Sequence, residues 1–421
     1  MNKDRLLILK GNLLFTPSSD QFVVHKEAFL ICADGVIQEI AERLPEQYAD
    51  CHVIDHGDAL IIPGFVDLHT HAAQFNQRGL GLDLQLLEWL KKYTFKEESR
   101  FADREYAREV YEKFADELIR QGTTRAAVFA TIHKESTQIL FDIFSEKGMG
   151  AYVGKVNMDA HCPAALREDT GVSLRETEEL IEAWKGHPLV KPIITPRFAI
   201  TSTKELLTGL GSMALKYDLP VQSHLSENMD EVNTISRLFP EQQAYYRVYN
   251  EYQLFGQTPT LMAHCIYLQE DAIQCMQKQG VVAVHCPDSN LNLASGVMQA
   301  RKLLEAGIQV GLGTDVGAGH DLSIRGTIVR SIQMSKLLYT MNPEYKPLTL
   351  AEAFYMGTKG GGAFFGKVGS LEPGYACDAL VIDDSAERVE GHTLLERLQR
   401  FIYGGNPSSI RERYVAGKKI G

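Results

Sequence analysis

This chain of 421 residues has few cysteines and no long apolar run, and both absences limit what it can be. Its seven cysteines are scattered and form no Cys-x-x-Cys pair, so we expect reduced thiols and a cytoplasmic location. No apolar run approaches the ~20 residues that a membrane span needs. The first ten residues carry four charges and lack the apolar core of a secretory leader, so no leader is expected.

Positive charge is also in short supply. Lysine and arginine number 43 against 54 aspartates and glutamates, which gives a net charge of -11. Because a nucleic-acid partner requires a basic surface, this balance disfavours one. Hydrophobic residues make up 44% and charged residues 23%, as in ordinary globular proteins. The length fits one large domain with an appendage, or two or three domains.

The most informative stretch is Pro-Gly-Phe-Val-Asp-Leu-His-Thr-His at residues 63–71. It predicts a short buried strand that ends in two histidines separated by one residue. Residues two apart on a strand point to the same face, so His69 and His71 direct two imidazoles into one space. Imidazole is a ligand that suits zinc and iron. Taken alone, the pair could equally be two polar residues at a strand end.

From residue 63 onward, apolar strands alternate with amphipathic helical stretches. The pattern predicts eight strands: Phe65–His71, Thr124–Thr131, Ala151–Met158, Val190–Phe198, Pro220–Leu225, Thr260–Cys265, Val281–Cys286 and Ile308–Asp315. Repeated βα units of this number fit an α/β fold, a (β/α)8 TIM barrel over residues 63–364. A doubly wound open sheet is the alternative.

Both ends of the chain, residues 1–62 and 365–421, are rich in strand-forming residues instead. Asp34-Gly35 lies between two strand-like runs and predicts a tight hairpin. Because both ends share this β-rich character, we expect the two to pair into one small β domain. The prediction is a β-sandwich beside the barrel.

Potential metal ligands lie at the ends of four predicted strands. The first strand ends in His69 and His71, and the fifth, sixth and eighth end in His224, His264 and Asp315. Barrel active sites lie at the carboxyl ends of the strands, so these five residues are expected to converge. Five ligands exceed what a closed structural zinc site uses. We therefore predict a catalytic metal ion with an open position for water, and one or two of the five acting on water or substrate.

Within this set, His264 and Asp315 are candidates for catalysis and His224 for substrate contact. Asp315 could take a proton from water whose pKa a metal ion lowers to roughly 7. Glu227 lies three residues after His224 and is expected to reach over the metal as a proton shuttle, although an isolated glutamate is more often on the surface. For Lys155, on the third predicted strand, we expect a structural salt bridge rather than a bridging role between two metal ions.

Together these features resemble the amidohydrolase superfamily over nearly the whole length. The resemblance rests on residues 63–71, on His224 and His264, on Gly-Leu-Gly-Thr-Asp at 311–315, and on Gly-Ser-Leu-Glu-Pro-Gly-Tyr-Ala-Cys-Asp-Ala-Leu-Val-Ile-Asp at 369–383. A narrower resemblance, to the guanine deaminases, rests on four further segments: Leu86–Phe95, Gly154–Asp159, Thr195–Phe198 and Gln222–Asn228.

The resemblance implies a zinc hydrolase that converts guanine to xanthine and ammonia, with one zinc ion per subunit, or iron in its place, and a homodimer as the assembly. It matches the metal-site residues to His69, His71, His224, His264 and Asp315. It matches the substrate-binding residues to Gln74, Arg197, Phe198, His224 and Glu227, with Glu227 also the proton shuttle.

Simple chemistry agrees with this assignment. Arg197 offers a fork of donors that suits the C6 carbonyl of guanine, Gln74 can pair with an amide-like purine edge, and Phe198 supplies an apolar face. Two positions depart from the family pattern: Cys265, where glycine is expected in many relatives, and Asp288, where asparagine is common. Neither departure removes a predicted ligand.

Alternatives remain open at this point. A deaminase of adenosine, cytosine or a triazine would use the same metal site, and a catalytically silent scaffold protein could share the fold. Retention of all five predicted ligands together with Glu227 argues against the scaffold. The cytidine-deaminase type of zinc fold is disfavoured, because its His-x-Glu and Pro-Cys-x-x-Cys signature is missing. The expected partner is a small molecule, with neither nucleic acid nor membrane.

Overall fold

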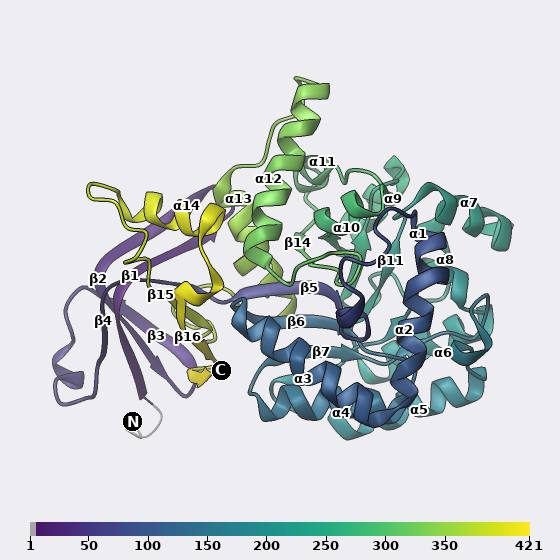
Figure 1. Ribbon diagram of the computed structural model, residues 1–421, viewed down its shortest axis with the longest axis horizontal. Helices are drawn as coiled ribbons and strands as arrows, with labels where there is room; N and C mark the ends of the chain where they lie inside the picture. The colour runs from purple at the N-terminus through teal and green to yellow at the C-terminus, as the bar shows by residue number, and fades with distance from the viewer. Residues whose placement is uncertain (1–5) are drawn as a thin grey trace.

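The computed structural model describes residues 6–421 and shows an α/β body beside a separate β sheet (Figure 1). Lys3, Asp4 and Arg5, three of the charges that argue against a leader, lie outside the described residues. Within the described part, no helix is both long enough and apolar enough to cross a membrane.

The separate sheet is built from both ends of the chain, as predicted. Its seven strands have the order β17-β16-β15-β4-β1-β2-β3, with bounds β1 Leu6–Ser18, β2 Gln21–Ala33, β3 Val36–Ala41, β4 Ile54–Pro63, β15 Ala379–Ile382, β16 Ile410–Val415 and β17 Lys418–Ile420. Strands β4 and β15 join the two ends in antiparallel register, with Leu60 opposite Ile382 and Pro63 opposite Ala379. These seven strands form a single sheet, so the two-layered sandwich stays a prediction.

The hairpin between β2 and β3 has the predicted turn. Asp34 and Gly35 have φ values of 51° and 79°, and positive φ at both central residues is the signature of a type I′ turn. This turn matches the right-handed twist of the strands, and Asp-Gly adopts it at little cost. The hairpin prediction is confirmed by the pairing of Ala33 with Val36.

Parallel strands of the body occupy the eight predicted positions. They form sheets ordered β5-β6-β7-β9 and β11-β12-β13-β14 and the pair β10-β8, with bounds β5 Phe65–His71, β6 Thr123–Phe129, β7 Gly150–Gly154, β8 Val156–Asn157, β9 Val190–Pro192, β10 Thr195–Pro196, β11 Val221–Leu225, β12 Thr260–His264, β13 Val282–His285 and β14 Val310–Leu312. The predicted third and fourth strands are each split in two. Pro192 and Pro196 lack the N–H that a continuous ladder would need.

Contacts at the sheet edges bring these ladders together. An isolated parallel bridge joins Ile194 to Val221, next to the end of β9. At the opposite edge, the N–H of Asp315 donates to the carbonyl of His69 at 2.8 Å, which joins the end of β14 to β5. The body is therefore α/β with parallel sheets, and complete closure into an eight-stranded barrel stays a prediction.

Helices lie between and around these strands (Figure 1). Their bounds are α1 Leu86–Trp89, α2 Phe95–Ser99, α3 Arg104–Arg120, α4 Lys134–Glu146, α5 Thr170–Trp184, α6 Lys204–Tyr217, α7 Met229–Leu238, α8 Tyr245–Glu251, α9 Glu270–Gln279, α10 Pro287–Asn292, α11 Ala300–Glu305, α12 Ile324–Met341, α13 Leu350–Tyr355 and α14 Leu394–Gly404. Two π-helical turns, Leu90–Thr94 and Met356–Gly360, follow α1 and α13.

Helix α3 shows how sequence periodicity becomes packing. Val110, Phe114 and Leu118 are spaced by four and are fully buried in one apolar cluster with Phe144 of α4 and Ala126 of β6. Burying a side chain of the valine, leucine or phenylalanine type contributes roughly 1.5–3 kcal/mol. This stripe fixes the helix against the start of the parallel sheet.

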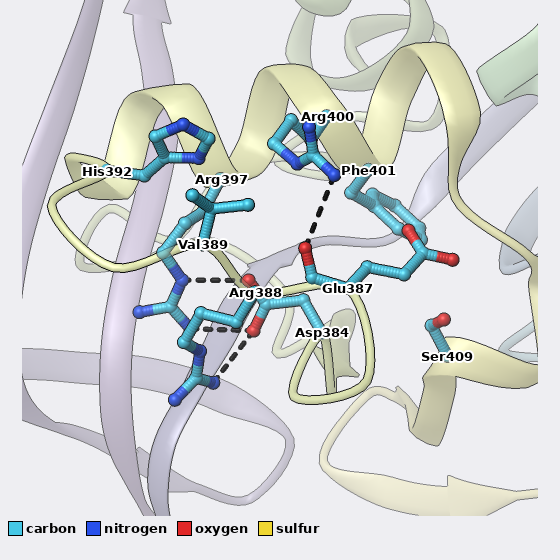
Figure 2. Close-up of a pocket in the computed structure, with 9 residues that line it drawn as sticks. All are labelled: Asp384, Glu387, Arg388, Val389, His392, Arg397, Arg400, Phe401 and Ser409. Carbon is cyan, nitrogen blue, oxygen red and sulfur yellow. Dashed lines mark hydrogen bonds and ion pairs between the residues drawn. The ribbon is translucent and has the colours of Figure 1, made fainter.

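Figure 2 shows a pocket beside α14 in the C-terminal segment. Two of its three arginines are paired with a carboxylate: Asp384 accepts from Arg397 Nε at 2.8 Å and from Arg388 Nη2 at 2.8 Å. Arg397 Nη1 also donates to Asp58 at the end of the N-terminal segment, at 2.9 Å. These ion pairs connect α14 to β4, so the charged side chains that line the pocket have a structural role.

A buried ion pair connects the body to the C-terminal strands. Arg125 of β6 donates through Nε and Nη2 to the two carboxylate oxygens of Asp378, at 2.6 and 3.0 Å. Asp378 also accepts from the N–H of Ala416 at 2.8 Å. Because both side chains are shielded from water, this bidentate pair fixes the body relative to the sheet.

Replacing Asp378 with asparagine should therefore leave a buried guanidinium without its counter-charge. We expect Asp378→Asn to lower the free energy of unfolding in urea by about 3–5 kcal/mol. The matched control is Glu109→Gln, which neutralises the exposed pair with Lys113 and should change it by less than about 1 kcal/mol. Equal effects of the two substitutions would contradict the importance of the buried pair.

Candidate metal centre and active site

Four of the five predicted ligands form one tight group. The ligand atoms of His69, His71, His224 and Asp315 all lie within 4.8 Å of one another. The Nε2 atoms of His69 and His71 lie 3.3 and 3.4 Å from Asp315 Oδ1. His71 Nε2 also lies 3.2 Å from His224 Nε2. We call these four residues the His3Asp cluster.

His264, the fifth predicted ligand, lies at the edge of the His3Asp cluster. Its Nε2 is 3.7 Å from Asp315 Oδ2 and 3.4 Å from Glu227 Oε2. The structure thus brings all five predicted residues together but places His264 between two carboxylates. That position suits contact with water or substrate as well as with a metal ion.

Hydrogen bonds on the far side of two rings set which nitrogen is free. His224 Nδ1 lies 2.6 Å from the carbonyl oxygen of Arg197, and His264 Nδ1 lies 2.9 Å from Asn290 Oδ1. Because these oxygens only accept, each Nδ1 carries the proton and donates it. The Nε2 lone pairs are then directed toward the cluster, which is how metal-binding histidines are usually oriented.

The charges within the cluster are those that a metal ion requires. Burial lowers the pKa of His69 and His224, and it lowers the pKa of His71 to about 3. Burial alone would raise the pKa of Asp315, but the neighbouring histidines hold it well below its usual range. The imidazoles are therefore neutral and the carboxylate is ionised, and metal ligands must be in these states.

One unpaired atom supports the same interpretation. His69 Nε2 is buried and, although it lies 3.3 Å from Asp315 Oδ1, it forms no hydrogen bond with any described residue. Leaving a buried polar atom unpaired costs roughly 1–3 kcal/mol, so such atoms usually have a ligand. Three nitrogens and one carboxylate oxygen suit zinc or iron. The residues present therefore fit a divalent metal ion.

Asp67 supports the His3Asp cluster from behind. Its Oδ1 accepts from the N–H of His69 at 3.2 Å and from the N–H of Thr314 at 3.1 Å. These bonds connect the end of β5 to the residue before Asp315, and burial raises the pKa of Asp67 to about 7. The sequence motif contained Asp67, but only the structure gives it this supporting contact.

Glu227 lies just past β11, as predicted, and faces the cluster. Its side chain is buried and reaches His264, while its own N–H donates to Glu231 Oε2 at 2.8 Å. Burial, with the nearby carboxylates of Asp315 and Glu231, raises the pKa of Glu227 well above its usual value. A carboxyl group with a raised pKa holds its proton to higher pH, which suits it to donate one.

The three predicted purine-binding residues are also buried near this site. Arg197 follows β10 directly, and the Phe198 ring lies 6.4 Å from the His224 ring between centroids. Gln74 lies in the turn after β5. Between Gln74 and Arg197 lies Glu98, which our sequence analysis did not identify.

Glu98 could have been found from helical spacing. It lies on α2 three residues after the buried Phe95, so both share one face of the helix. A glutamate on a buried helix face is rare unless it is paired. That signal is visible only once the helix register is known.

Phe198 also lines a pocket of about 320 Å³ on the outer side of the site. The pocket extends from buried Phe95 and Phe198 to the exposed side chains of Lys91 and Arg237. The pocket therefore connects the apolar side chains beside the His3Asp cluster with solvent.

The remaining predicted positions have structural explanations. Lys155 forms a buried ion pair with Glu168, as expected. Asp288 accepts from Arg330 Nε at 2.6 Å. Cys265 has a φ of +47°, in the left-handed region that favours glycine, which explains why glycine suits this position.

Comparison with known proteins supports this description. Residues 60–420 match the Amidohydrolase family. A guanine deaminase of Dictyostelium discoideum is 39% identical over 407 residues, covering 94% of this chain and 88% of the relative. The crystal structure of a guanine deaminase from C. acetobutylicum, with guanine bound in the active site, has 48% identity and a TM-score of 0.98, covering 99% of this chain and all of that one.

A more distant solved structure shares the fold with a different substrate. An adenosine deaminase from Xanthomonas campestris with bound zinc has 25% identity and a TM-score of 0.85, covering 98% of this chain and 92% of that chain. The resemblance predicted from the motifs is thus confirmed.

Removal of one cluster imidazole should abolish metal binding. In His71→Ala, we expect the metal content after dialysis, measured by mass spectrometry, to fall from about one ion per chain to a small fraction. The control, His52→Ala, removes an exposed histidine and should keep its metal. Full metal content in His71→Ala would show that the ion is held elsewhere.

Proposed function

The chain belongs to the amidohydrolase family, and from that membership we propose that it hydrolyses guanine to xanthine and ammonia. The observation that carries the proposal is a buried arginine, Arg197, beside the His3Asp cluster. A donor-only side chain at that point suits a base with a carbonyl oxygen. Similarity to guanine deaminases over nearly the whole chain supports the same substrate.

The proposal includes the finer architecture. The eight strand positions form a (β/α)8 barrel over residues 63–364, and residues 1–62 and 365–421 form the small β domain. A homodimer and a cytoplasmic location complete the proposal as predictions from the sequence.

Zinc is the proposed metal ion, as in the zinc-bound adenosine deaminase structure. His69, His71, His224 and Asp315 would hold it, with His264 adjoining. When bound, zinc would lower the pKa of a water molecule so that hydroxide is available at neutral pH. The protein supplies neutral imidazoles, an ionised carboxylate and exclusion of bulk water, since all four side chains are buried.

Guanine would be held by its edge and its face. Arg197 donates to the C6 oxygen, Gln74 pairs with the adjoining amide-like edge, and Phe198 packs against the ring. His224, whose ring lies beside Phe198, borders the carbon that reacts. Holding a planar base in this way places C2, which bears the exocyclic amine, toward the cluster.

The proton transfers follow from the protonation states. Asp315, ionised in the resting site, takes a proton as water adds its oxygen to C2 of guanine. Glu227, whose raised pKa favours the protonated form, gives its proton to the adjacent ring nitrogen. His264 Nε2, between the two carboxylates, accepts a hydrogen bond from the attacking water. Glu227, now a carboxylate, takes the proton of the new hydroxyl group at C2 and passes it to the amine. The C2–N bond then breaks as the C2 carbonyl forms, ammonia leaves xanthine behind, and the proton on Asp315 returns to Glu227.

Arg197 also separates this proposal from its nearest alternative. A deaminase places the amine that leaves at the cluster, and adenosine with its C6 amine at that place has no carbonyl oxygen to offer Arg197. The buried arginine donors would then be left unpaired. A scaffold without catalysis would have no need for a proton-carrying Glu227 beside neutral histidines.

Ammonia release from guanine by the purified protein, with xanthine as the second product, tests the proposal. In Glu227→Gln, loss of the proton shuttle should lower kcat by about 10²–10⁴-fold while the metal content stays at the wild-type level. The exposed control Glu241→Gln should have wild-type activity. Wild-type protein that retains its metal but ignores guanine would refute the substrate assignment.

The raised pKa of Glu227 predicts a pH dependence. A carboxylic acid with a raised pKa keeps its proton to higher pH, and the shuttle fails only when pH rises through that pKa. We therefore expect kcat to be maintained at neutral pH and to fall on the alkaline side. A kcat that increases steadily from about pH 6 to about pH 9 would contradict a protonated Glu227.

A further inference from the structure

Glu98 is a buried carboxylate that the reaction described above leaves unused. It is 5% exposed, and its Oε1 accepts from Arg197 Nη1 at 2.7 Å and from Gln74 Nε2 at 2.9 Å. We propose that Glu98 is a positioning residue that fixes both side chains and thereby selects purines with an oxygen at C6. The inference rests on the proposed function, because it assigns Gln74 and Arg197 to the purine edge.

The first argument is charge. Arg197 is 3% exposed, and within residues 6–421 Glu98 is the only carboxylate in ion-pair contact with it. A buried guanidinium without a counter-charge is strongly unfavourable, so the pair keeps the arginine in place. The paired site is also close to neutral, which suits a neutral base such as guanine.

The second argument is geometry at Arg197. Nη1 donates to both oxygens of Glu98, so this nitrogen is fully engaged. No residue in the described range 6–421 accepts from Nε or Nη2, so their N–H groups are left for a ligand. The Arg197 guanidinium carbon also lies 5.5 Å from the centroid of the Phe95 ring on the same helix as Glu98. Helix α2 thus holds the guanidinium from two directions.

The third argument is the orientation of the Gln74 amide. A carboxylate only accepts hydrogen bonds, so Gln74 must present its NH2 group to Glu98. Its Oε1 accepts from the N–H of Gly317 at 3.2 Å, two residues after Asp315. The amide cannot rotate by half a turn without losing both bonds. Gln77 Nε2 also donates to this Oε1, at 3.5 Å, so Glu98 fixes the direction of the one remaining N–H of Gln74.

These constraints make the site selective for the substituent at one ring position, C6. Fixed arginine N–H groups bind an oxygen and oppose an amine or a hydrogen at C6. A site built to hydrogen-bond one polar atom rejects analogues that lack it by large factors, because its own buried groups are left unpaired. Without Glu98, Arg197 could move away, and this discrimination would weaken.

The test compares two competitive inhibitors of guanine deamination. Hypoxanthine has the C6 oxygen and purine lacks it, and neither has the C2 amine. In Glu98→Gln, we expect hypoxanthine to bind about 10–100-fold more weakly, the effect of losing a hydrogen bond to a charged group. Purine should change by less than about threefold, and KM for guanine should rise more than kcat falls.

Two further variants test whether the weaker inhibitor binding reflects general damage to the fold. Glu88→Gln makes the same change on neighbouring α1, at an exposed pair with Lys92, and should match the wild type. Glu98→Asp keeps the charge beside Arg197 but is too short to reach both partners. We expect it to retain wild-type metal content and thermal stability with an intermediate loss of hypoxanthine binding.

The outcomes separate the two proposals. Wild-type protein that does not deaminate guanine would overturn the proposed function and this inference with it. Active wild type with an unchanged ratio of hypoxanthine to purine binding in both Glu98 variants would overturn only the role of Glu98. So would equal losses for the two inhibitors, because a merely structural glutamate would weaken both alike.

Discussion

The site depends on the hydrogen bonds of one buried side chain, Asp67, which hold two strand ends together. Asp67 binds the backbone of His69 and the backbone and hydroxyl of Thr314, so it joins the ends of β5 and β14. Asp315 follows Thr314 and donates its N–H back to the carbonyl of His69. The first and last parallel strands are thereby held in register at their carboxyl ends. These hydrogen bonds place the side chains of His69 and Asp315 next to each other in the His3Asp cluster.

Near the joined ends of β5 and β14, three carboxyl groups have different surroundings, and these give them different properties. Asp315 lies among imidazoles, which hold its pKa well below the usual range, whereas burial and nearby carboxylates raise the pKa of Glu227. Glu98 is matched by a buried guanidinium and serves as an anchor. Environments that push the pKa values of neighbouring groups apart are what separate a base from an acid in one site. Under the proposed function, the same functional group thus acts as base, acid or support.

The separate β sheet contributes to this arrangement from a distance. Strands from both ends of the chain pair in it, and the bidentate contact between Arg125 and Asp378 connects it to β6 of the body. Because β4 leads within two residues into β5, the sheet also fixes the start of the strand that carries His69. Both ends of β5 are therefore held, which limits how far its histidines can move.

The sequence by itself determined the strand positions, the Asp34-Gly35 turn and the five residues that converge, because these depend on local patterns: period-two spacing, turn chemistry and ligands placed at strand ends. It could not determine that the third and fourth strands are split, or that His264 lies outside the tight group of four. Nor did it indicate Glu98, whose partners Gln74 and Arg197 are 24 and 99 residues away. Those features depend on contacts between distant segments, and no short-range pattern specifies such contacts. Tertiary structure alone decided which groups surround each buried carboxyl group, and those neighbours set the direction of its pKa shift.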